Sequence, residues 1–241
     1  PDLGKSINLD AFEPMVKIAK DMGVKRFIYA SSSSVYGIKN EQNVHEEMSL
    51  EPLTDYSKFK AMCEDTLLKY KSSDFEVVVI RPATVCGYSK RQRLDVVVNI
   101  LTNLAYNKGE ITVLGGEQLR PNIHIKDMIQ AYKTTISSDS SLVNGQIFNA
   151  GYENIKVNDI ANLVKKNIGD NVKIIKKKSN DDRSYHISSE KIKRVLNFSA
   201  SFTIEDAIKD LKKAFDSKLL IDPLNNIKFY NIKLMNNINL R

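Results

Sequence analysis

The stretch YSKFKAMCEDTLLKYKSSDFEVVVIRPATVCG, residues 56–87, joins a helical pattern to a strand pattern. Apolar residues recur at helical spacing in its first half, whereas residues 75–80 contain three consecutive valines, which is typical of a strand buried on both faces. Another apolar run, at 27–30, precedes the stretch, so strand, helix and strand form one crossover unit. The sequence therefore predicts an α/β fold with a parallel sheet.

The alternation of helix and strand patterns continues on both sides of this unit. Helices are expected from the start of the chain to about Met22 and near 97–104, 125–136, 157–168 and 203–215, with Thr203 as an N-cap. Further strands are expected near 111–114, 146–150 and 172–175. This pattern favours a doubly wound parallel sheet with helices on its faces.

The composition is that of a soluble globular chain, with 42% hydrophobic and 27% charged residues among 241. No apolar run approaches the roughly 20 residues of a membrane span, and the start of the chain lacks a secretory pattern. We therefore expect a cytoplasmic protein with no membrane partner. The net charge of +7 is spread along the chain, and the lysine cluster at 173–178 lacks aromatic neighbours, so no nucleic-acid partner is expected.

Cysteine and histidine are too sparse for a metal site or a disulfide framework. The two cysteines, Cys63 and Cys86, and three scattered histidines offer no spaced set of ligands. Both thiols and His124 are interpreted as packing residues. The chain begins at Pro1 and enters a helical pattern almost at once, so we expect a fragment that lacks its beginning.

Polar side chains gather where a doubly wound sheet places its ligand, beyond the carboxyl ends of the strands. Ser31–Ser34 follow the first strand, and Tyr56 and Lys60 lie four residues apart on one helical face. A tyrosine, with an ordinary pKa of about 10, is a useful general base only if nearby positive charge lowers its pKa. A lysine one turn away supplies that charge, and a serine hydroxyl would orient the same substrate oxygen.

Four motifs, in this order, resemble the extended short-chain dehydrogenase/reductase superfamily, specifically the NAD-dependent nucleotide-sugar epimerases and dehydratases that resemble UDP-glucose 4-epimerase. They are the serine loop ending in Val35-Tyr36-Gly37, the Tyr56 and Lys60 pair, residues 81–87 and residues 115–127. The resemblance covers nearly the whole chain. It places the family's glycine-rich phosphate-binding segment in a first strand, helix and strand that this sequence lacks, so an N-terminally truncated member is expected.

The resemblance implies a role for each matching residue. Tyr56 is the catalytic base, Lys60 lowers its pKa and holds the nicotinamide ribose, and Ser32 is the hydroxyl partner. The implied cofactor is NAD, with NADP not excluded, and the implied cofactor-binding residues are Asn8, Ala30, Ser31, Tyr56, Lys60, Pro82, Ala83, Thr84 and Val85. The implied substrate is a nucleotide-diphosphate sugar, with contacts at Ser32, Ser33, Thr84, Arg120 and Arg183.

The residues after Ser32 separate the possible reactions. Ser33 and Ser34 stand where the family's 4,6-dehydratases have Asp and Glu. Decarboxylases have Glu at the position of Ser34, and double-epimerase/reductases have Cys. We therefore expect a 4-epimerase that oxidises its substrate to a 4-keto sugar and reduces it again with bound NAD. An NAD(P)H-dependent 4-ketoreductase and a non-catalytic binding protein on the same fold remain alternatives.

The resemblance also implies a Rossmann-type sheet that lacks its first strands, joined to a smaller α+β substrate domain, and it divides the chain accordingly. Residues 1–87 and 124–150 are expected to form the dinucleotide-binding domain, 88–123 and 151–221 the substrate-binding domain, and 222–241 a polar tail. A homodimer is expected through the helix that carries Tyr56 and Lys60.

Two further groups of charged residues lie near these motifs. Glu64 is expected to pair with Lys60 while remaining largely solvated. The basic loop of Lys90, Arg91 and Arg93 is open to two interpretations, contact with a diphosphate or with water.

Overall fold

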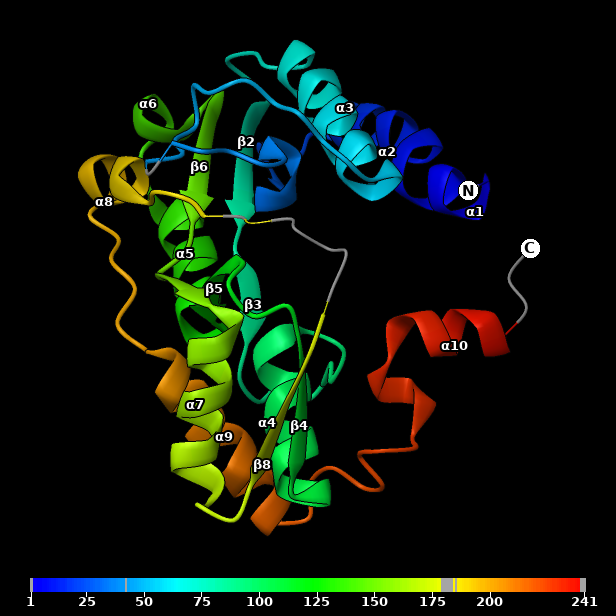
Figure 1. The fold of residues 1–241 in the computed structure, drawn as a ribbon. Helices are drawn as coiled ribbons and strands as arrows, with labels where there is room; N and C mark the ends of the chain where they lie inside the picture. The colour runs from blue at the N-terminus through cyan, green and yellow to red at the C-terminus, as the bar shows by residue number, and fades with distance from the viewer. Residues whose placement is uncertain (1, 42, 179–183, 185, 239–241) are drawn as a thin grey trace.

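The computed structural model describes residues 2–41, 43–178, 184 and 186–238 (Figure 1). Its central sheet is parallel, with the strand order β1-β2-β6, and comprises β1 (Arg26–Ala30), β2 (Glu76–Pro82) and β6 (Gln146–Ala150). The register pairs Ala30 with Ile80 and Pro82 with Ala150, so the strands run to one common edge. The predicted α/β class with a Rossmann-type parallel sheet is confirmed.

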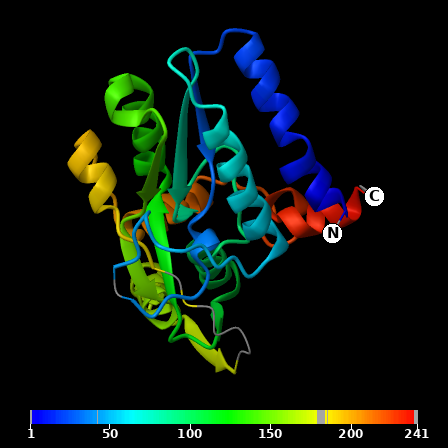
Figure 2. The same ribbon diagram turned by 90° about the horizontal axis from the view of Figure 1, so that it is seen from above.

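Helices cover both faces of the central sheet (Figure 2). One face carries α2 (Phe12–Asp21) and α3 (Asp55–Lys69), preceded by α1 (Asp2–Lys5) and a π-helical turn, Ser6–Asp10. The other face carries α5 (Ile125–Ser137), α6 (Ser140–Val143) and α8 (Glu190–Leu196). The two helical layers exclude water from both faces of the sheet.

The β2 strand shows how the sequence pattern produces this burial. Val77 and Val79 pack with residues of α2 and α3, whereas Val78 and Ile80 pack with residues of α5 and α8. All four side chains are fully buried, because successive side chains of a strand point to opposite faces. The two-sided burial predicted from the valine run is confirmed.

A second part of the molecule holds two smaller sheets. One has the order β3-β5-β7 and comprises β3 (Thr84–Cys86), β5 (Leu119–His124) and β7 (Glu153–Lys156). The other pairs β4 (Glu110–Leu114) with β8 (Lys173–Lys177) in parallel. Around them pack α4 (Val97–Lys108), α7 (Val157–Ile168) and α9 (Ile204–Asp216). Thr203 caps α9 through a capping box with Asp206, as predicted.

Strands β3, β5 and β7 were not predicted. They are only three to six residues long, and β5 contains Pro121, which cannot donate a backbone hydrogen bond. Their pairing is parallel between β3 and β5 and antiparallel between β5 and β7. Tertiary pairing rather than local pattern makes these strands.

The end of the described chain contains a 3₁₀ turn, Ile227–Phe229, followed by α10 (Asn231–Asn237). Tyr230 is buried here against Leu94, Leu211 and Phe215. The predicted polar tail therefore contributes to a small apolar cluster. No helix in the described part of the chain is long and apolar enough to cross a membrane.

Candidate active site

The serine loop begins where β1 ends. Ser32 has an extended backbone and caps the 3₁₀ turn Ser33–Tyr36, because its Oγ accepts a hydrogen bond from the Ser34 amide at 3.2 Å. The Ser32 and Ser34 hydroxyls are 2.8 Å apart. Gly37 ends the turn at a φ of 69°, which a side chain rarely adopts. These contacts hold the Ser32 hydroxyl at the carboxyl edge of the sheet.

The first turn of α3 forms a second wall of the candidate site, and the serine loop forms the first. Thr54 caps this helix through a capping box, since its hydroxyl accepts from the Ser57 amide at 3.2 Å. Tyr56 lies in the first turn, where the Ser32 side chain acts on its phenol and lowers its pKa. The two residues predicted to share a substrate oxygen are thus brought together, although 24 positions separate them in the chain. Ser32 lies in the loop after β1, and Tyr56 lies on α3.

Both walls face one cavity of about 460 Å³. Its lining includes Pro82, the last residue of β2, and Ala83, which lies between β2 and β3. Arg120 and Pro121 reach it from β5. The full lining consists of Ser31, Ser32, Ser33, Ser34, Tyr56, Pro82, Ala83, Thr84, Val85, Arg93, Val96, Arg120 and Pro121.

The environment of Tyr56 acts on its pKa in two directions. Burial raises the pKa of the phenol above its ordinary value, while the positive charge of Arg93 and the hydrogen bond from Ser32 lower it. About half of the residue, 49%, remains exposed, which leaves the ring open to the cavity. Tyr56 is therefore accessible to a substrate and lies beside a cation.

Lys60 contacts the backbone beneath this pair. Its Nζ donates to the Ala30 carbonyl at 2.7 Å and lies 5.6 Å from the centre of the Tyr56 ring. Burial lowers the pKa of Lys60, and the nearby Cys63 and Glu64 oppose that shift. Arg93 is the cation that acts on the Tyr56 pKa in this structure, so the effect expected of Lys60 stays a prediction.

Glu64 corrects one expectation. It does not pair with Lys60 at the surface but is buried, where it accepts hydrogen bonds from the Ser31 hydroxyl and from Arg81. Arg81 donates to both carboxylate oxygens, with Nη2 2.6 Å from Oε2 and Nε 3.1 Å from Oε1. A helix-face pattern cannot reveal this contact, because its partners lie on β1 and β2.

The Arg81 guanidinium extends this buried network toward β6. Its Nη1 donates to the Tyr36 hydroxyl at 2.8 Å, and that hydroxyl donates to Asn149 Oδ1 at 2.7 Å. Burial raises the pKa of Tyr36 to about 12. The backbone amide of Asn149 in turn donates to Glu46 Oε1 at 2.7 Å. The loop that carries the serines is thus hydrogen-bonded to Arg81 of β2 and to Asn149 of β6.

The remaining predicted residues divide between the cavity and its surroundings. Thr84 and Arg120 line the cavity, and Arg120 Nη1 donates to the Leu119 carbonyl at 3.0 Å. Asn8 is outside the lining and donates to the Gly4 carbonyl at 2.9 Å. Arg183 lies outside the described residues.

Four lining residues, Ser34, Arg93, Val96 and Pro121, were not assigned to the site from the sequence. Arg93 was noted only as part of a basic loop with two interpretations, and Val96 was not noted. The signal that could have found Arg93 is its cationic loop following the motif at 81–87. In the structure Arg93 reaches the cavity, whereas Lys90 and Arg91 do not line it.

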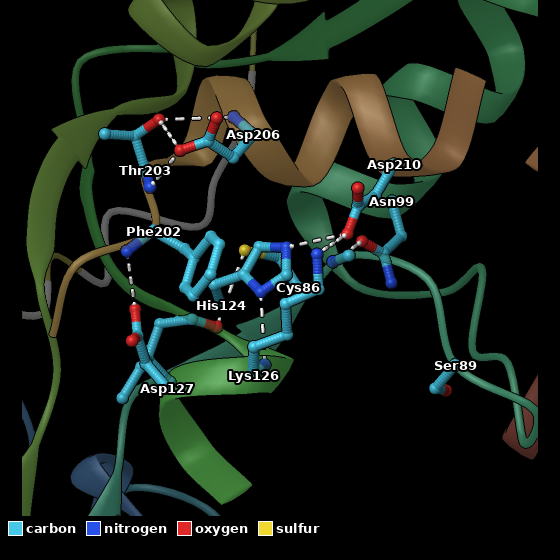
Figure 3. Close-up of polar contacts among 12 residues, drawn as sticks. Cys86, Ser89, Asn99, His124, Lys126, Asp127, Phe202, Thr203, Asp206 and Asp210 are labelled. Atoms are coloured by element: carbon cyan, nitrogen blue, oxygen red, sulfur yellow. Dashed lines mark hydrogen bonds and ion pairs between the residues drawn. The ribbon is translucent and has the colours of Figure 1, made fainter. Parts of the chain in front are cut away.

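The parallel strands β3 and β5 end side by side at Cys86 and His124 (Figure 3). The His124 side chain is fully buried, its Nδ1 accepts from the Lys126 amide at 3.1 Å, and its Nε2 lies 3.3 Å from Asp210 Oδ2. Burial lowers the pKa of His124. Among the described residues, no group of three or more His, Cys, Asp and Glu side chains is placed to hold a metal ion.

Comparison with known proteins places this geometry in a family context. The model of the "NAD dependent epimerase/dehydratase family" matches residues 4–151. An uncharacterized UDP-glucose epimerase of Bacillus subtilis, YtcB, is 29% identical over 159 residues, covering 65% of this chain and 49% of that protein. A putative UDP-arabinose 4-epimerase of Arabidopsis thaliana is 25% identical over 211 residues, covering 78% of this chain and 50% of that protein.

The fold also matches solved structures. The UDP-glucuronic acid 4-epimerase from Bacillus cereus, in complex with UDP-glucuronic acid and NAD, superposes with a TM-score of 0.77 at 23% identity. The match covers 88% of this chain and 68% of that chain. This chain spans about half the length of the curated relatives it matches.

Proposed function

Because the chain belongs to the NAD-dependent epimerase/dehydratase family, we propose that it is an enzyme that epimerises a nucleotide-diphosphate sugar at carbon 4. One observation carries the proposal: Ser32 and Tyr56 line one cavity together with two arginines, Arg93 and Arg120, and both Ser32 and Arg93 lower the pKa of the Tyr56 phenol. The cavity therefore combines a proton acceptor with cations suited to an anionic substrate.

The residues present fit the nicotinamide end of NAD. Residues 82–85 and Ser31 line the same cavity as Tyr56. Lys60 lies near the Tyr56 ring, and its ammonium donates a hydrogen bond to the Ala30 carbonyl. NAD, or NADP in its place, would supply a reversible hydride acceptor next to the sugar. We propose Asn8, Ala30, Ser31, Tyr56, Lys60 and residues 82–85 as its binding residues.

The side chains of the cavity would handle the proton. Tyr56, as phenolate, would take the proton of the sugar 4-hydroxyl while carbon 4 is oxidised to a ketone, and it would return the proton on reduction. Ser32 would hydrogen-bond the same sugar oxygen. If the keto sugar turns its other face to the cofactor before reduction, the configuration at carbon 4 inverts. The hydride and the proton removed in the first step are both returned in the second.

Substrate binding is assigned to the polar and cationic lining. Ser32, Ser33 and Thr84 would contact the sugar, and Arg120 would bind the diphosphate, for which a planar guanidinium is suited. Arg183 is proposed as a second diphosphate ligand on the family resemblance alone. Dehydration is disfavoured because none of the described lining residues is Asp or Glu.

The experiment uses UDP-glucose and UDP-galactose, each incubated with the protein and NAD without added reductant. Interconversion of the two sugars, lost in Tyr56→Phe, is the expected result. If neither sugar reacts and NADPH is consumed only when a 4-keto sugar is supplied, the protein is a ketoreductase. If the protein binds the sugar and Tyr56→Phe changes nothing in any assay, it is a binding protein.

We also propose that the protein is a homodimer. Met15, Ile18 and Met22 on and beside α2, and Met62 on α3, are 50–79% exposed on the helical layer that carries Tyr56. Pairing of this layer with its copy would bury these side chains. Sedimentation equilibrium should give twice the chain mass, and a monomer at all concentrations would contradict the proposal.

The domain division and the location are proposed on the same basis. Residues 1–87 and 124–150 would bind the dinucleotide, and residues 88–123 and 151–221 would bind the sugar nucleotide, with 222–241 as a tail. Both cysteines are free, as is usual in a reducing compartment, which supports a cytoplasmic location. Nucleic acid is not proposed as a partner.

A further inference from the structure

We infer that residues 226–231, near the end of the chain, position Arg93 in the candidate active site by holding Asp95. The inference rests on the proposed function only in assigning the cavity to a reaction. The contacts themselves connect a tail whose role the sequence did not reveal to a side chain that lines the cavity.

Asp95 is the connecting residue. Its Oδ1 accepts a hydrogen bond from Arg93 Nε at 2.9 Å, and its Oδ2 accepts from the Asn231 backbone amide at 2.8 Å. The Asp95 carboxylate therefore caps the first turn of α10 with one oxygen and orients the guanidinium with the other. Only 19% of the Asp95 side chain is exposed, which limits competition from water.

The residue between Arg93 and Asp95 is fixed by the same segment. The Leu94 amide donates to the Phe229 carbonyl at 2.8 Å, and the Leu94 side chain is fully buried against Tyr230 and Phe215. The Tyr230 hydroxyl donates to the Pro223 carbonyl at 2.8 Å and accepts from Asn103 at 3.0 Å. Three consecutive loop residues thus depend on the tail for their position.

The loop needs this support because residues 88–96 form neither helix nor strand. Arg93 projects from the loop into the cavity that holds Tyr56 and Arg120. Its charge opposes the rise that burial causes in the pKa of Tyr56. A displaced Arg93 would leave the phenol without this stabilising charge, so its pKa would rise.

The test removes one backbone hydrogen-bond donor from the tail. Asn231→Pro deletes the amide that donates to Asp95, and proline is tolerated at the first position of a helix. Tyr230 has an extended backbone, which a following proline accepts. The matched control is Asn231→Ala, which keeps the amide and removes only the side-chain contact with Arg91.

Two readouts are made on each variant. The pKa of Tyr56 is measured by NMR of the protein labelled with ¹³C at the tyrosine ζ carbon, with Tyr56→Phe to assign the signal. Asn231→Pro should raise this pKa by about half a unit or more, and Asn231→Ala should leave it unchanged. The acidic limb of the kcat profile should move to higher pH with it, since the reaction needs the phenolate.

A double-mutant cycle assigns the effect to Arg93. Arg93→Gln alone should raise the pKa of Tyr56, and adding Asn231→Pro should then have no further effect. An equal pKa in the parent, Asn231→Pro and Asn231→Ala would overturn the inference. If the parent converts no nucleotide sugar, the proposed function fails, while the NMR titration still tests the position of Arg93.

A measurement on the unmodified chain covers the case in which Asn231→Pro does not fold. The Arg93 Nε–H signal, assigned by Arg93→Lys, should exchange with water more slowly than the Nε–H of Arg91, whose Nε has no bond to a carboxylate among the described contacts. Equal exchange rates for the two would show that Asp95 does not hold Arg93.

Discussion

Arg81 and Glu64 form a buried ion pair beneath the candidate active site, with Arg81 Nη2 2.6 Å from Glu64 Oε2 and side chains only 3% and 2% exposed. Arg81 immediately precedes residues 82–85, and Glu64 follows Lys60 by one helical turn. Glu64 also accepts from Ser31, the neighbour of Ser32. The Glu64 carboxylate therefore connects α3 with the serine loop and with the end of β2, two of the segments that line the cavity.

Glu64→Gln should lower the free energy of unfolding by about 3 kcal/mol or more, because it leaves the Arg81 charge buried without its partner. The measurement is urea unfolding at neutral pH. Glu46→Gln is the matched control, since burial raises the pKa of Glu46 and glutamine keeps an acceptor for the Asn149 amide. An equal loss in both variants would contradict the special role of the Arg81 pair.

Tyr56→Phe should reduce kcat by about 100-fold or more, because the variant loses the group that accepts the substrate proton. Its free energy of unfolding should change little, since about half of Tyr56 is exposed. Tyr36→Phe should show the reverse, as its buried hydroxyl bonds Arg81 and Asn149. Steady-state kinetics and urea unfolding separate the two, and equal kinetic losses would count against Tyr56 as the base.

Arg120→Met should raise KM for the nucleotide sugar by about 10-fold or more, since a charge-assisted hydrogen bond is worth about 1.5–3 kcal/mol. The change in kcat should be smaller, because the diphosphate is remote from the reacting carbon. Arg120→Lys should recover part of the affinity, as it restores the charge without the planar fork. An unchanged KM in Arg120→Met would exclude Arg120 as a diphosphate ligand.

His124, which lies beside Asp210 in Figure 3, should make the protein less stable in mild acid. Burial and Lys126 lower its pKa below 6.5, while Asp210, Asp127 and Asp206 oppose the shift. Between the lowered pKa and 6.5 the unfolded chain binds a proton that the folded protein does not. The free energy of unfolding is therefore unaffected by the titration of His124 above pH 6.5 and decreases as the pH falls through that window.

The variant that tests this effect is His124→Asn, because asparagine also caps a helix but does not titrate. Urea unfolding at about pH 7.5 and 5.5 should show a smaller loss of stability in the variant than in the parent. The comparison of the two pH values within each protein removes any constant effect of the smaller side chain. The same pH dependence in both proteins would assign it to other groups.

Gly37→Ala should destabilise the protein by about 2 kcal/mol or more, because its φ is 69° and an added Cβ would lie 2.0 Å from the Glu51 carbonyl oxygen. Gly23→Ala is the matched control, with a φ of 79° but no atom within 4 Å of the added Cβ. Its loss should be about 1 kcal/mol. Thermal unfolding of both variants measures the difference, and equal losses would show that Glu51 moves away at no cost.

Local patterns predicted the central sheet because its strands and helices have strong periodicity. The valine run of β2 predicts a strand buried on both faces, and the apolar stripe of α3 predicts a helix buried on one face. The structure shows both. The short strands β3, β5 and β7 lack such periodicity, so their pairing partners could not be predicted from local patterns.

The sequence by itself determined the fold class and brought Ser32, Tyr56 and Lys60 forward as candidates, since residue type, spacing and position at a strand or helix end are local properties. Only the tertiary structure decided that Glu64 binds Arg81 and Ser31 instead of Lys60. It also decided that Arg93 lies in the cavity, held through Asp95 by Asn231. The physical reason is that these contacts join side chains far apart in the chain, whose distances are set by how sheets and helices pack.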